Sequence, residues 1–252
     1  MKNCKVISTC FNEGRAVREK TKMVGVPAGP FDHSQNFPTR DHVLDLLRLN
    51  IEQENTIDAG VEYDTIIVNN DTGWKKGNDW LESINGQLTK NGKIIVHNRE
   101  NYGRAFGGYD YAFSLYKDIY EHWIFTEDDV LINSDRFYID LINQINSNKA
   151  NGAVAIIGVS YEDYHRNIGI QCQHCHGSIA LYKTDTLNLI HKKHNMLPHV
   201  TKDMSQSYVN QIMLGEILLS NTVIQLGLEL PVADRKMFNF AYDFMRGIDV
   251  AR

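Results

Sequence analysis

Long apolar runs, cysteines and excess positive charge are all scarce in this sequence. No apolar run approaches the roughly 20 residues that cross a bilayer, and the first residues enter a strand-like run without the layout of a signal peptide. The four cysteines are too few for a disulfide framework in a chain of 252 residues. A formal charge of −5 and a pI of about 6.0 argue against a basic nucleic-acid-binding surface. We therefore expect a cytoplasmic protein with reduced thiols, no transmembrane segment and no nucleic-acid partner.

The sequence does contain an alternation of strand-like and helical segments. Hydrophobic residues make up 42% of the chain, enough for a large core. The patterns predict strands at residues 5–11, 64–68, 93–97, 123–126 and 153–159, and helices at residues 39–55, 80–88 and 107–120. Strands separated by helices form parallel βαβ units, so we expect an α/β fold with ligands at the carboxyl ends of the strands.

Three consecutive carboxylates, Glu127-Asp128-Asp129, follow the predicted strand 123–126. Adjacent like charges repel each other, and a divalent cation is the simplest way to neutralise them. Oxygen ligands at a strand end suit Mg²⁺ or Mn²⁺, and Mg²⁺ usually binds together with the phosphates of a substrate. A solvated acidic turn is the alternative for such a run taken alone.

Polar clusters also end the other predicted strands, at residues 9–13, 70–71 and 98–104. All of them would meet the acidic triplet at one edge of a parallel sheet. Phe11, beside the acceptors Asn12 and Asp71, is suited to stack on and read a nucleobase. The combination favours a nucleotide pocket over a solvated turn.

The order of these motifs resembles the GT-A glycosyltransferases, above all the inverting enzymes of family 2. The resemblance covers about the first half of the chain. It rests on Thr-Cys-Phe-Asn-Glu at 9–13, Asn-Asp-Thr-Gly at 70–73, Asn-Tyr-Gly-Arg-Ala at 101–105 and Glu-Asp-Asp at 127–129. Thr9 stands where that family usually has proline, and Asn70 replaces the first acid of the second motif. The acidic triplet is also similar to the metal motif of N-acetylglucosaminyltransferase I.

This resemblance implies a single GT-A domain over residues 1–252. A Rossmann-like, nucleotide-sugar-binding half (1–132) with a mixed, mainly parallel sheet would be fused to a smaller acceptor-binding half (133–252). The implied activity is a Mn²⁺- or Mg²⁺-dependent transfer of a sugar from a nucleotide-diphosphate sugar, UDP-sugars first among them, to a glycan or lipid-linked acceptor. Asp129 would bind the metal ion, Asp128 would face the donor sugar and Glu127 the ribose. The other implied donor-binding residues are Thr9, Phe11, Asn12, Glu13, Asn70, Asp71, Asn101, Gly103 and Arg104.

The catalytic base is expected in the second half of the chain. An inverting transfer needs a carboxylate that takes the proton of the acceptor hydroxyl. The family pattern of an acidic residue that opens a helix, with glycine about ten residues later, is matched by Glu216 and Gly227. Glu216 is therefore the first candidate, and a solvent-facing helix glutamate is the alternative. Asp203 is the rival base, or else a helix N-cap.

The segment Cys172-Gln173-His174-Cys175-His176 matches the attachment signature of haem c. Haem attachment normally calls for an exported protein, and zinc would need further ligands such as His165 and His174. We interpret the segment as a loop near the active site. Several GT-A enzymes complete their metal shell with a late histidine, which the resemblance assigns to His176 before His199, with a structural histidine as the alternative.

The chain ends in an aromatic segment, residues 236–246. Met237, Phe240, Phe244 and Ile248 would share one face of a helix. We expect this face to pack over the acceptor half, with peripheral contact to a membrane surface or to another subunit as the alternatives.

Two other functions remain open. A sugar-phosphate nucleotidyltransferase shares a related sheet and acidic metal ligands. It usually has a Gly-rich, Arg-containing loop directly after the first strand, whereas residues 11–15 contain one glycine. The other function is a noncatalytic metal-, haem- or redox-binding module around Cys172, Cys175 and His176.

Overall fold

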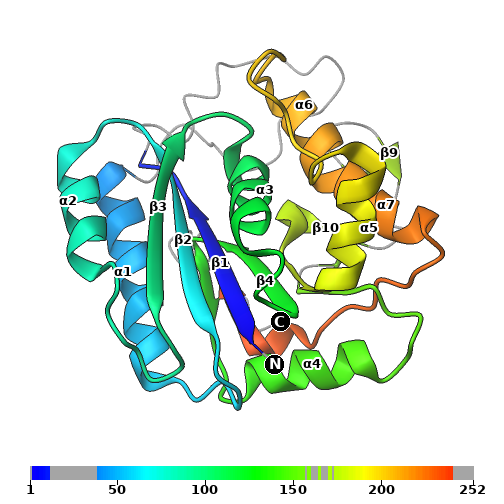
Figure 1. Cartoon of the computed structure of the whole chain (residues 1–252), viewed down its shortest axis with the longest axis horizontal. Coiled ribbons are helices and arrows are strands. Elements are labelled where there is room, and N and C mark those ends of the chain that lie inside the picture. Colours follow the sequence, from blue (N-terminus) through cyan, green and yellow to red (C-terminus); the bar gives the residue numbers. More distant parts are fainter. Residues whose placement is uncertain are drawn as a thin grey trace.

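The computed structural model describes residues 2–11, 39–156, 158–159, 164–165, 170–171 and 173–240. At its centre lies a six-stranded sheet in the order β3-β2-β1-β4-β11-β6 (Figure 1). The sheet strands are β1 (Asn3–Thr9), β2 (Asp64–Asp71), β3 (Ile94–Glu100), β4 (His122–Glu127), β6 (Ala153–Ala155) and β11 (Ala180–Lys183). The first four in this order run parallel, and β11 runs antiparallel to both of its neighbours. The predicted α/β class with a mixed, mainly parallel sheet is confirmed.

Helices cover both faces of this sheet. Because side chains alternate along a strand, Ile7 and Ile124 face one side while Val6 and Phe125 face the other. The first side is covered by α1 (Arg40–Thr56), α2 (Lys75–Ile84) and α4 (Phe137–Asn146). The second is covered by α3 (Arg104–Tyr116), α5 (Thr184–His194) and α7 (Leu218–Gln225). None of the helices in the described part of the chain is long and apolar enough to cross a membrane.

The predicted helices exist, but two of them begin earlier than the pattern suggests. α2 begins at Lys75 instead of residue 80, although Gly77 and Asn78 are poor helix formers. Tertiary packing explains the difference, since a Cβ on Gly77 would stand only 2.6 Å from the Phe11 ring. α3 begins at Arg104 instead of residue 107, directly after Gly103, which has a φ of 68° and turns the chain into the helix. The first helix, predicted at residues 39–55, is α1 (Arg40–Thr56), and the structure shows Thr39 as its N-cap.

Shorter elements complete the fold, and all of them except β5 lie in the second half of the chain. They are β5 (Val130–Ile132), β7 (Gly158–Val159), β8 (Tyr164–His165), β9 (Ile170–Gln171), β10 (His174–Cys175), η1 (His176–Ser178), α6 (Tyr208–Gln211), η2 (Ile212–Ile217), η3 (Arg235–Met237) and β12 (Phe238–Phe240). The predicted strand 153–159 is thus divided between β6 and β7. The predicted terminal helix is wrong for its first residues, since β12 pairs with β5 and Phe238 packs in the core. Residues 241–252 lie outside the described part of the chain.

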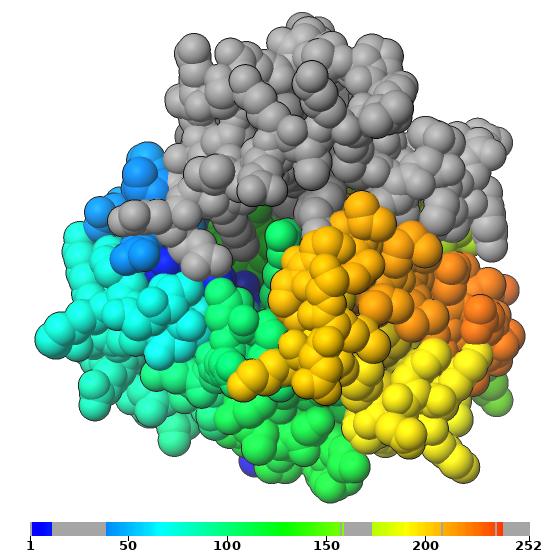
Figure 2. Space-filling model, turned by 90° about the horizontal axis from the view of Figure 1, so that it is seen from above, coloured from blue at the N-terminus to red at the C-terminus, as the bar shows by residue number. Residues whose placement is uncertain are grey.

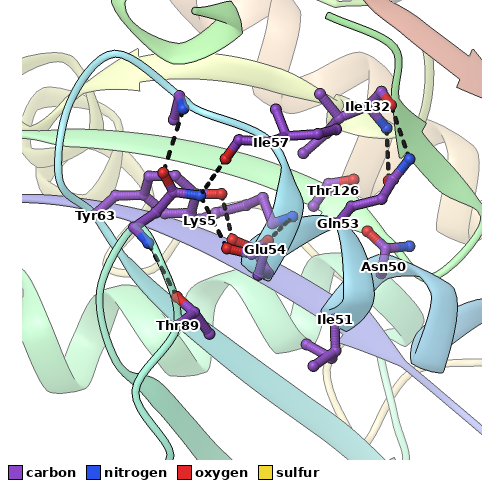
Figure 3. Close-up of polar contacts among 12 residues, drawn as sticks. Lys5, Asn50, Ile51, Gln53, Glu54, Ile57, Tyr63, Thr89, Thr126 and Ile132 are labelled. Atoms are coloured by element: carbon purple, nitrogen blue, oxygen red, sulfur yellow. Dashed lines mark hydrogen bonds and ion pairs between the residues drawn. The ribbon is translucent and has the colours of Figure 1, made fainter. Parts of the chain in front are cut away.

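One buried stripe of α1 is polar and ties the helix to the sheet (Figure 3). Lys5 of β1 forms an ion pair with Glu54, which also accepts a hydrogen bond from the Tyr63 hydroxyl. The side-chain amide of Gln53 forms two hydrogen bonds with the backbone of Ile132. It donates to the Ile132 carbonyl at 2.8 Å and accepts from the Ile132 amide at 2.9 Å. These bonds fix α1 against β5, the strand that directly follows the acidic triplet.

Candidate active site

The acidic triplet forms a tight turn at the carboxyl end of β4. Asp128 is fully buried, and the hydroxyl of Thr9 donates to its carboxylate at 2.7 Å. The side chain of Asn50 donates to the Asp128 carbonyl at 2.8 Å. This placement corrects the expectation that Asp128 faces the donor sugar, because its carboxylate is directed to β1. Thr9, also expected to bind the donor, instead holds the turn in place.

The other two carboxylates of the turn, Glu127 and Asp129, are half-buried. Glu127 lies on the same face of β4 as Phe125, the face covered by α3. The Tyr109 ring of α3 stacks on Phe125 with centroids 4.6 Å apart. Burial raises the pKa of Tyr109, and the charges of Glu127 and Asp129 contribute to the rise. The Tyr109 hydroxyl is buried and has no hydrogen-bond partner among the described residues.

His174, His176 and Glu216 meet beside this turn. Oε1 of Glu216 lies 3.1 Å from Nε2 of His174 and 3.3 Å from Nδ1 of His176. The Glu216 side chain is 6% exposed and that of His174 is fully buried, whereas that of His176 is 54% exposed. The hydrogen bond with Glu216 raises the pKa of His176 against the opposing effect of burial, and the charges of Glu216, Glu127 and Asp129 raise it further.

Close backbone approaches bring these residues to the acidic turn. Gly177, next to His176, has a φ of 60°, and a Cβ on it would stand 3.5 Å from Oε1 of Glu127. Gly215, next to Glu216, lies so near Phe106 of α3 that a Cβ would come within 2.1 Å of its ring. The site therefore combines Glu127, Asp129 and Glu216 with two imidazoles.

The placement of Glu216 differs from the prediction in one respect. Glu216 does not open a helix, because it lies in η2, a π-helical turn within a helical segment that runs from Tyr208 to Gln225. It does not face solvent either. Single π-helical turns are frequent at functional sites, since the extra residue shifts a side chain away from the regular helical face. Asp203, the rival base, is exposed in a turn and is not a helix N-cap, because α6 begins only at Tyr208.

The predicted base-stacking residue Phe11 lies in the core. Phe11 is 1% exposed, and its ring packs against Trp74 with centroids 5.3 Å apart. The expectation that it stacks on a nucleobase is therefore wrong. Its neighbours Asn12 and Glu13 lie outside the described residues.

Asn70 and Asp71 follow one another at the end of β2 but differ in exposure. Asn70 is buried, and its side chain donates to the Ser8 hydroxyl at 3.0 Å and to the Thr9 carbonyl at 3.1 Å. These two bonds join β2 to β1. The structure therefore corrects the expectation that Asn70 binds the donor. Asp71 is half-buried and accepts from the Gly73 amide at 2.8 Å and from Asn78 at 2.9 Å. Asp71 is therefore the more accessible of the two.

The loop after β3 is supported by Arg99, a buried residue that the motif comparison did not single out. Its guanidinium binds the Asn70 side chain and the Tyr102 carbonyl, and it lies 4.2 Å from the centre of the Tyr102 ring. In the sequence, the position of Arg99 inside the polar cluster 98–104 is the feature that could have indicated its role. The neighbouring Gly103 amide donates to Gln206 at 2.9 Å.

That last bond joins the loop to the segment before α6. The gold atoms of this segment lie directly beside the green atoms at the start of α3 in Figure 2. The predicted donor residues of the loop, Asn101 and Arg104, are exposed, and Asn101 donates to the Cys10 sulfur at 3.4 Å.

The haem-like segment is only partly described, because Cys172 lies outside the described residues. Cys175 is buried, and its thiol donates to the Ile179 carbonyl at 2.8 Å, as expected of a structural cysteine. His199 is also buried, and its Nδ1 donates to the Leu197 carbonyl at 2.9 Å. Of the histidines considered for the metal, the structure thus brings His176 and His174 to the site, and it gives His199 a structural contact.

Comparisons with known proteins give distant likenesses. No family model matches the chain, and no curated protein matches it. Among solved structures, it is similar to 4-diphosphocytidyl-2C-methyl-D-erythritol synthase from Anaerococcus prevotii, with 11% identity, 99% of this chain and 95% of that chain covered, and a TM-score of 0.47. It is also similar to CMP:2-keto-3-deoxy-manno-octonic acid synthetase complexed with CTP, with 12% identity, 92% of this chain and 89% of that chain covered, and a TM-score of 0.48. The likeness to mouse xyloside xylosyltransferase 1 has 11% identity, covers 100% of this chain and 83% of that chain, and has a TM-score of 0.41. These likenesses are too distant to transfer a reaction or substrate to this chain.

Proposed function

We propose that this protein is a metal-dependent glycosyltransferase that moves a sugar from a nucleotide-diphosphate sugar to a hydroxyl group of a glycan or lipid-linked acceptor. The observation that supports it is the meeting of Glu127, Asp129 and Glu216 with His176 at the carboxyl end of β4. Ligands of open α/β sheets bind at that edge. A concentration of negative charge next to imidazole nitrogen is suited to a divalent cation and its phosphate ligands.

Within the acidic turn, one residue supports the backbone, and the other two would bind the metal ion and the donor. Asp128, held by Thr9 and Asn50, fixes the backbone of the turn. Asp129 and His176 would hold a Mn²⁺ or Mg²⁺ ion, which when bound neutralises the charge of the departing diphosphate. Glu127 would contact the ribose, and Arg104, exposed at the start of α3, would contact the phosphates or the donor sugar. UDP-sugars are the first donors to test.

The products distinguish this function from nucleotidyl transfer. A glycosyltransferase releases a nucleoside diphosphate from the sugar nucleotide, and in the inverting reaction that we propose the new bond has the opposite anomeric configuration. A sugar-phosphate nucleotidyltransferase instead releases pyrophosphate from a nucleoside triphosphate and a sugar 1-phosphate. The test incubates the protein with both kinds of substrate and Mn²⁺ and follows phosphorus-containing products by ³¹P NMR. Water serves as the acceptor until a better one is known.

The ligands are chosen beforehand by a thermal-shift panel of nucleotide sugars with and without Mn²⁺, because a ligand of the folded state raises the melting temperature. We expect one class of nucleotide sugar to stabilise the protein more with Mn²⁺ than without it, and to release a nucleoside diphosphate. Formation of pyrophosphate from the triphosphate pair, without turnover of any sugar nucleotide, would overturn the proposal.

The variant Asp129→Asn tests the acidic turn within this function. Removing one carboxylate charge from the proposed metal site should abolish metal-dependent donor turnover while the melting temperature of the free protein stays nearly unchanged, since Asp129 is only half-buried. Asp118→Asn, at an exposed acid in the turn after α3, is the matched control and should keep full activity. Undiminished turnover in Asp129→Asn would remove this residue from the site.

A further inference from the structure

We propose that His174, His176 and Glu216 together bind a transition-metal ion, so that Glu216 is a metal ligand and not the base that takes the proton of the acceptor. The ligand set would be two imidazoles and the carboxylate of Glu216, which narrows the ion to Mn²⁺ or Zn²⁺ over Mg²⁺. Asp129 would then act on the ion through its charge from beside the site and not as a direct ligand. The inference rests on the proposed function only in placing this ion at the phosphates of the donor. Binding of the ion itself requires no donor.

The spacing of the three side chains fits one ion. Their ligand atoms all lie within 4.8 Å of one another, and Oε1 of Glu216 is 3.1 and 3.3 Å from the two imidazole nitrogens. An ion held at about 2.1 Å by tetrahedrally arranged ligands separates those ligands by about 3.4 Å. Small side-chain rotations would therefore be enough to admit it.

Burial and charge favour a cation at this position. Glu216 and His174 are almost completely removed from water, and a buried carboxylate needs compensating positive charge. One oxygen of Glu216 lies close to both imidazole nitrogens, as expected of ligands that share one ion. Glu127 and Asp129 add further negative charge next to His176. A divalent ion would bind the carboxylate and both nitrogens at once.

Hydrogen bonds and close packing hold the backbone around the three residues, as a metal site requires. The Cys175 amide, between the two histidines, donates to the Ser220 hydroxyl of α7 at 2.9 Å, and the Cys175 thiol donates to Ile179. Gly215 packs against the Phe106 ring, and this contact fixes the position of the next residue, Glu216, relative to α3. The hydrogen bonds of Cys175 thus hold the backbone of the neighbouring His174 and His176, and the packing of Gly215 holds the backbone of Glu216.

The exposure of the three ligands differs in a way that suits a reactive site. Two of them anchor the ion from inside the protein, and His176 is 54% exposed. Three protein ligands leave coordination positions open, as in catalytic zinc sites, whereas structural sites have four. Oxygen atoms of a phosphate are suitable ligands for such open positions. Imidazole nitrogen is a poor ligand for Mg²⁺, which prefers oxygen, so the site should discriminate between the ions.

The test measures ion binding by the whole protein in the absence of a donor. Isothermal titration with Zn²⁺, Mn²⁺ and Mg²⁺, after removal of metals with a chelator, gives the stoichiometry and affinity. X-ray absorption of the Zn²⁺-loaded wild-type protein counts the imidazoles around the ion, which requires no variant. We expect one Zn²⁺ or Mn²⁺ per chain with two imidazoles, and much weaker binding of Mg²⁺.

The variants His174→Ala, His176→Ala and Glu216→Gln should each weaken Zn²⁺ and Mn²⁺ binding at least about tenfold, since even the partners behind metal ligands are worth that much. His191→Ala and Glu229→Gln, on α5 and in an exposed loop, are the matched controls and should bind as the wild type does. Circular dichroism in the chelator checks the fold of each variant. Because His176 is exposed, its variant should fold even if that of the buried His174 does not.

Three results would overturn the inference. They are fewer than two imidazoles around the ion in the wild-type protein, equal affinity for Mg²⁺, and unchanged ion binding in Glu216→Gln together with lost turnover, which would make Glu216 the base. Tight ion binding that depends on the three residues, without any transfer from a sugar nucleotide, would leave the site in place and overturn only the proposed function.

Discussion

Asp128 is held from two sides by buried side chains that would not themselves touch a donor. Thr9 binds its carboxylate and Asn50 binds its carbonyl. A buried carboxylate is tolerated because it receives hydrogen bonds, and those bonds are stronger than bonds between neutral groups. Asn50 is fully buried in the middle of α1, where its amide reaches over the turn. The direction of Glu127 and Asp129 thus depends on residues outside the motif.

Asn50→Ala tests this dependence. It removes the donor to a buried carbonyl and leaves a small cavity, so we expect a loss of about 2 kcal/mol in the free energy of unfolding. Weaker stabilisation by Mn²⁺ and a nucleotide sugar should accompany it. Urea unfolding and thermal shift measure the two effects.

The control is Asn55→Ala, at an exposed asparagine of the same helix. It should change the stability by less than about 0.5 kcal/mol. If the Asn50 and Asn55 variants were equally stable and bound ligands equally well, Asn50 would not position the acidic turn.

At the scale of elements, η2 is the unusual part of the structure. Its six residues from Ile212 to Ile217 form a π-helical turn between α6 and α7. Gly215 permits this turn to pack directly on Phe106 at the start of α3, and Glu216 follows it into the site. The same part of α3 carries Tyr109, which stacks on Phe125 and whose pKa the charge of Glu127 helps to raise. α3 therefore connects the two groups of carboxylates.

Gly215→Ala should disturb this contact, because the new Cβ would come within 2.1 Å of the buried Phe106 ring. Such overpacking typically costs about 1–3 kcal/mol. We expect a lower melting temperature and weaker binding of Zn²⁺ or Mn²⁺, since η2 must move and takes Glu216 with it.

The second variant Phe106→Leu makes room for the added methyl group. We therefore expect the double variant to be less destabilised than the sum of its two single variants, which indicates coupling between the two sites. Strict additivity would show that the cost of Gly215→Ala arises from some other contact.

At the scale of the whole molecule, the sheet crosses the boundary predicted at residue 132. β11 of the second half pairs with β4 of the first, and β6 pairs with β11. The largest core cluster likewise contains residues from both halves, among them Val6, Phe125, Tyr182 and Leu219. The two halves share one core, so neither buries its apolar surface without the other.

We therefore expect a single cooperative unfolding transition. Near-ultraviolet and far-ultraviolet circular dichroism should give coincident urea curves, as they do for two-state unfolding. A fragment of residues 1–132 should fail to fold alone, since β4 would lose its β11 neighbour and become an unpaired edge. Two separated transitions, or a folded fragment, would contradict this expectation.

Much of the fold could be predicted from local patterns in the sequence. The alternation of strands and helices depends on apolar periodicity, which is a property of neighbouring residues. The collection of polar clusters at one sheet edge follows from the topology of parallel βαβ units alone. Local signals did not place the start of α2, because Gly77 is accommodated there by packing against the distant Phe11 ring. They did not place the start of α3 either, because it depends on the left-handed conformation of Gly103.

The details of the site were decided by tertiary structure. That Asp128 turns inward while Phe11 enters the core depends on Asn50, Trp74 and other residues far away in the chain. His174 and Glu216 are 42 residues apart and meet only because η2 packs on α3 and β10 lies beside it. The sequence alone determined that acidic residues would gather at the end of β4. Which of them face the pocket, and which histidines join them, depends on close packing between elements, for which a local pattern carries no information.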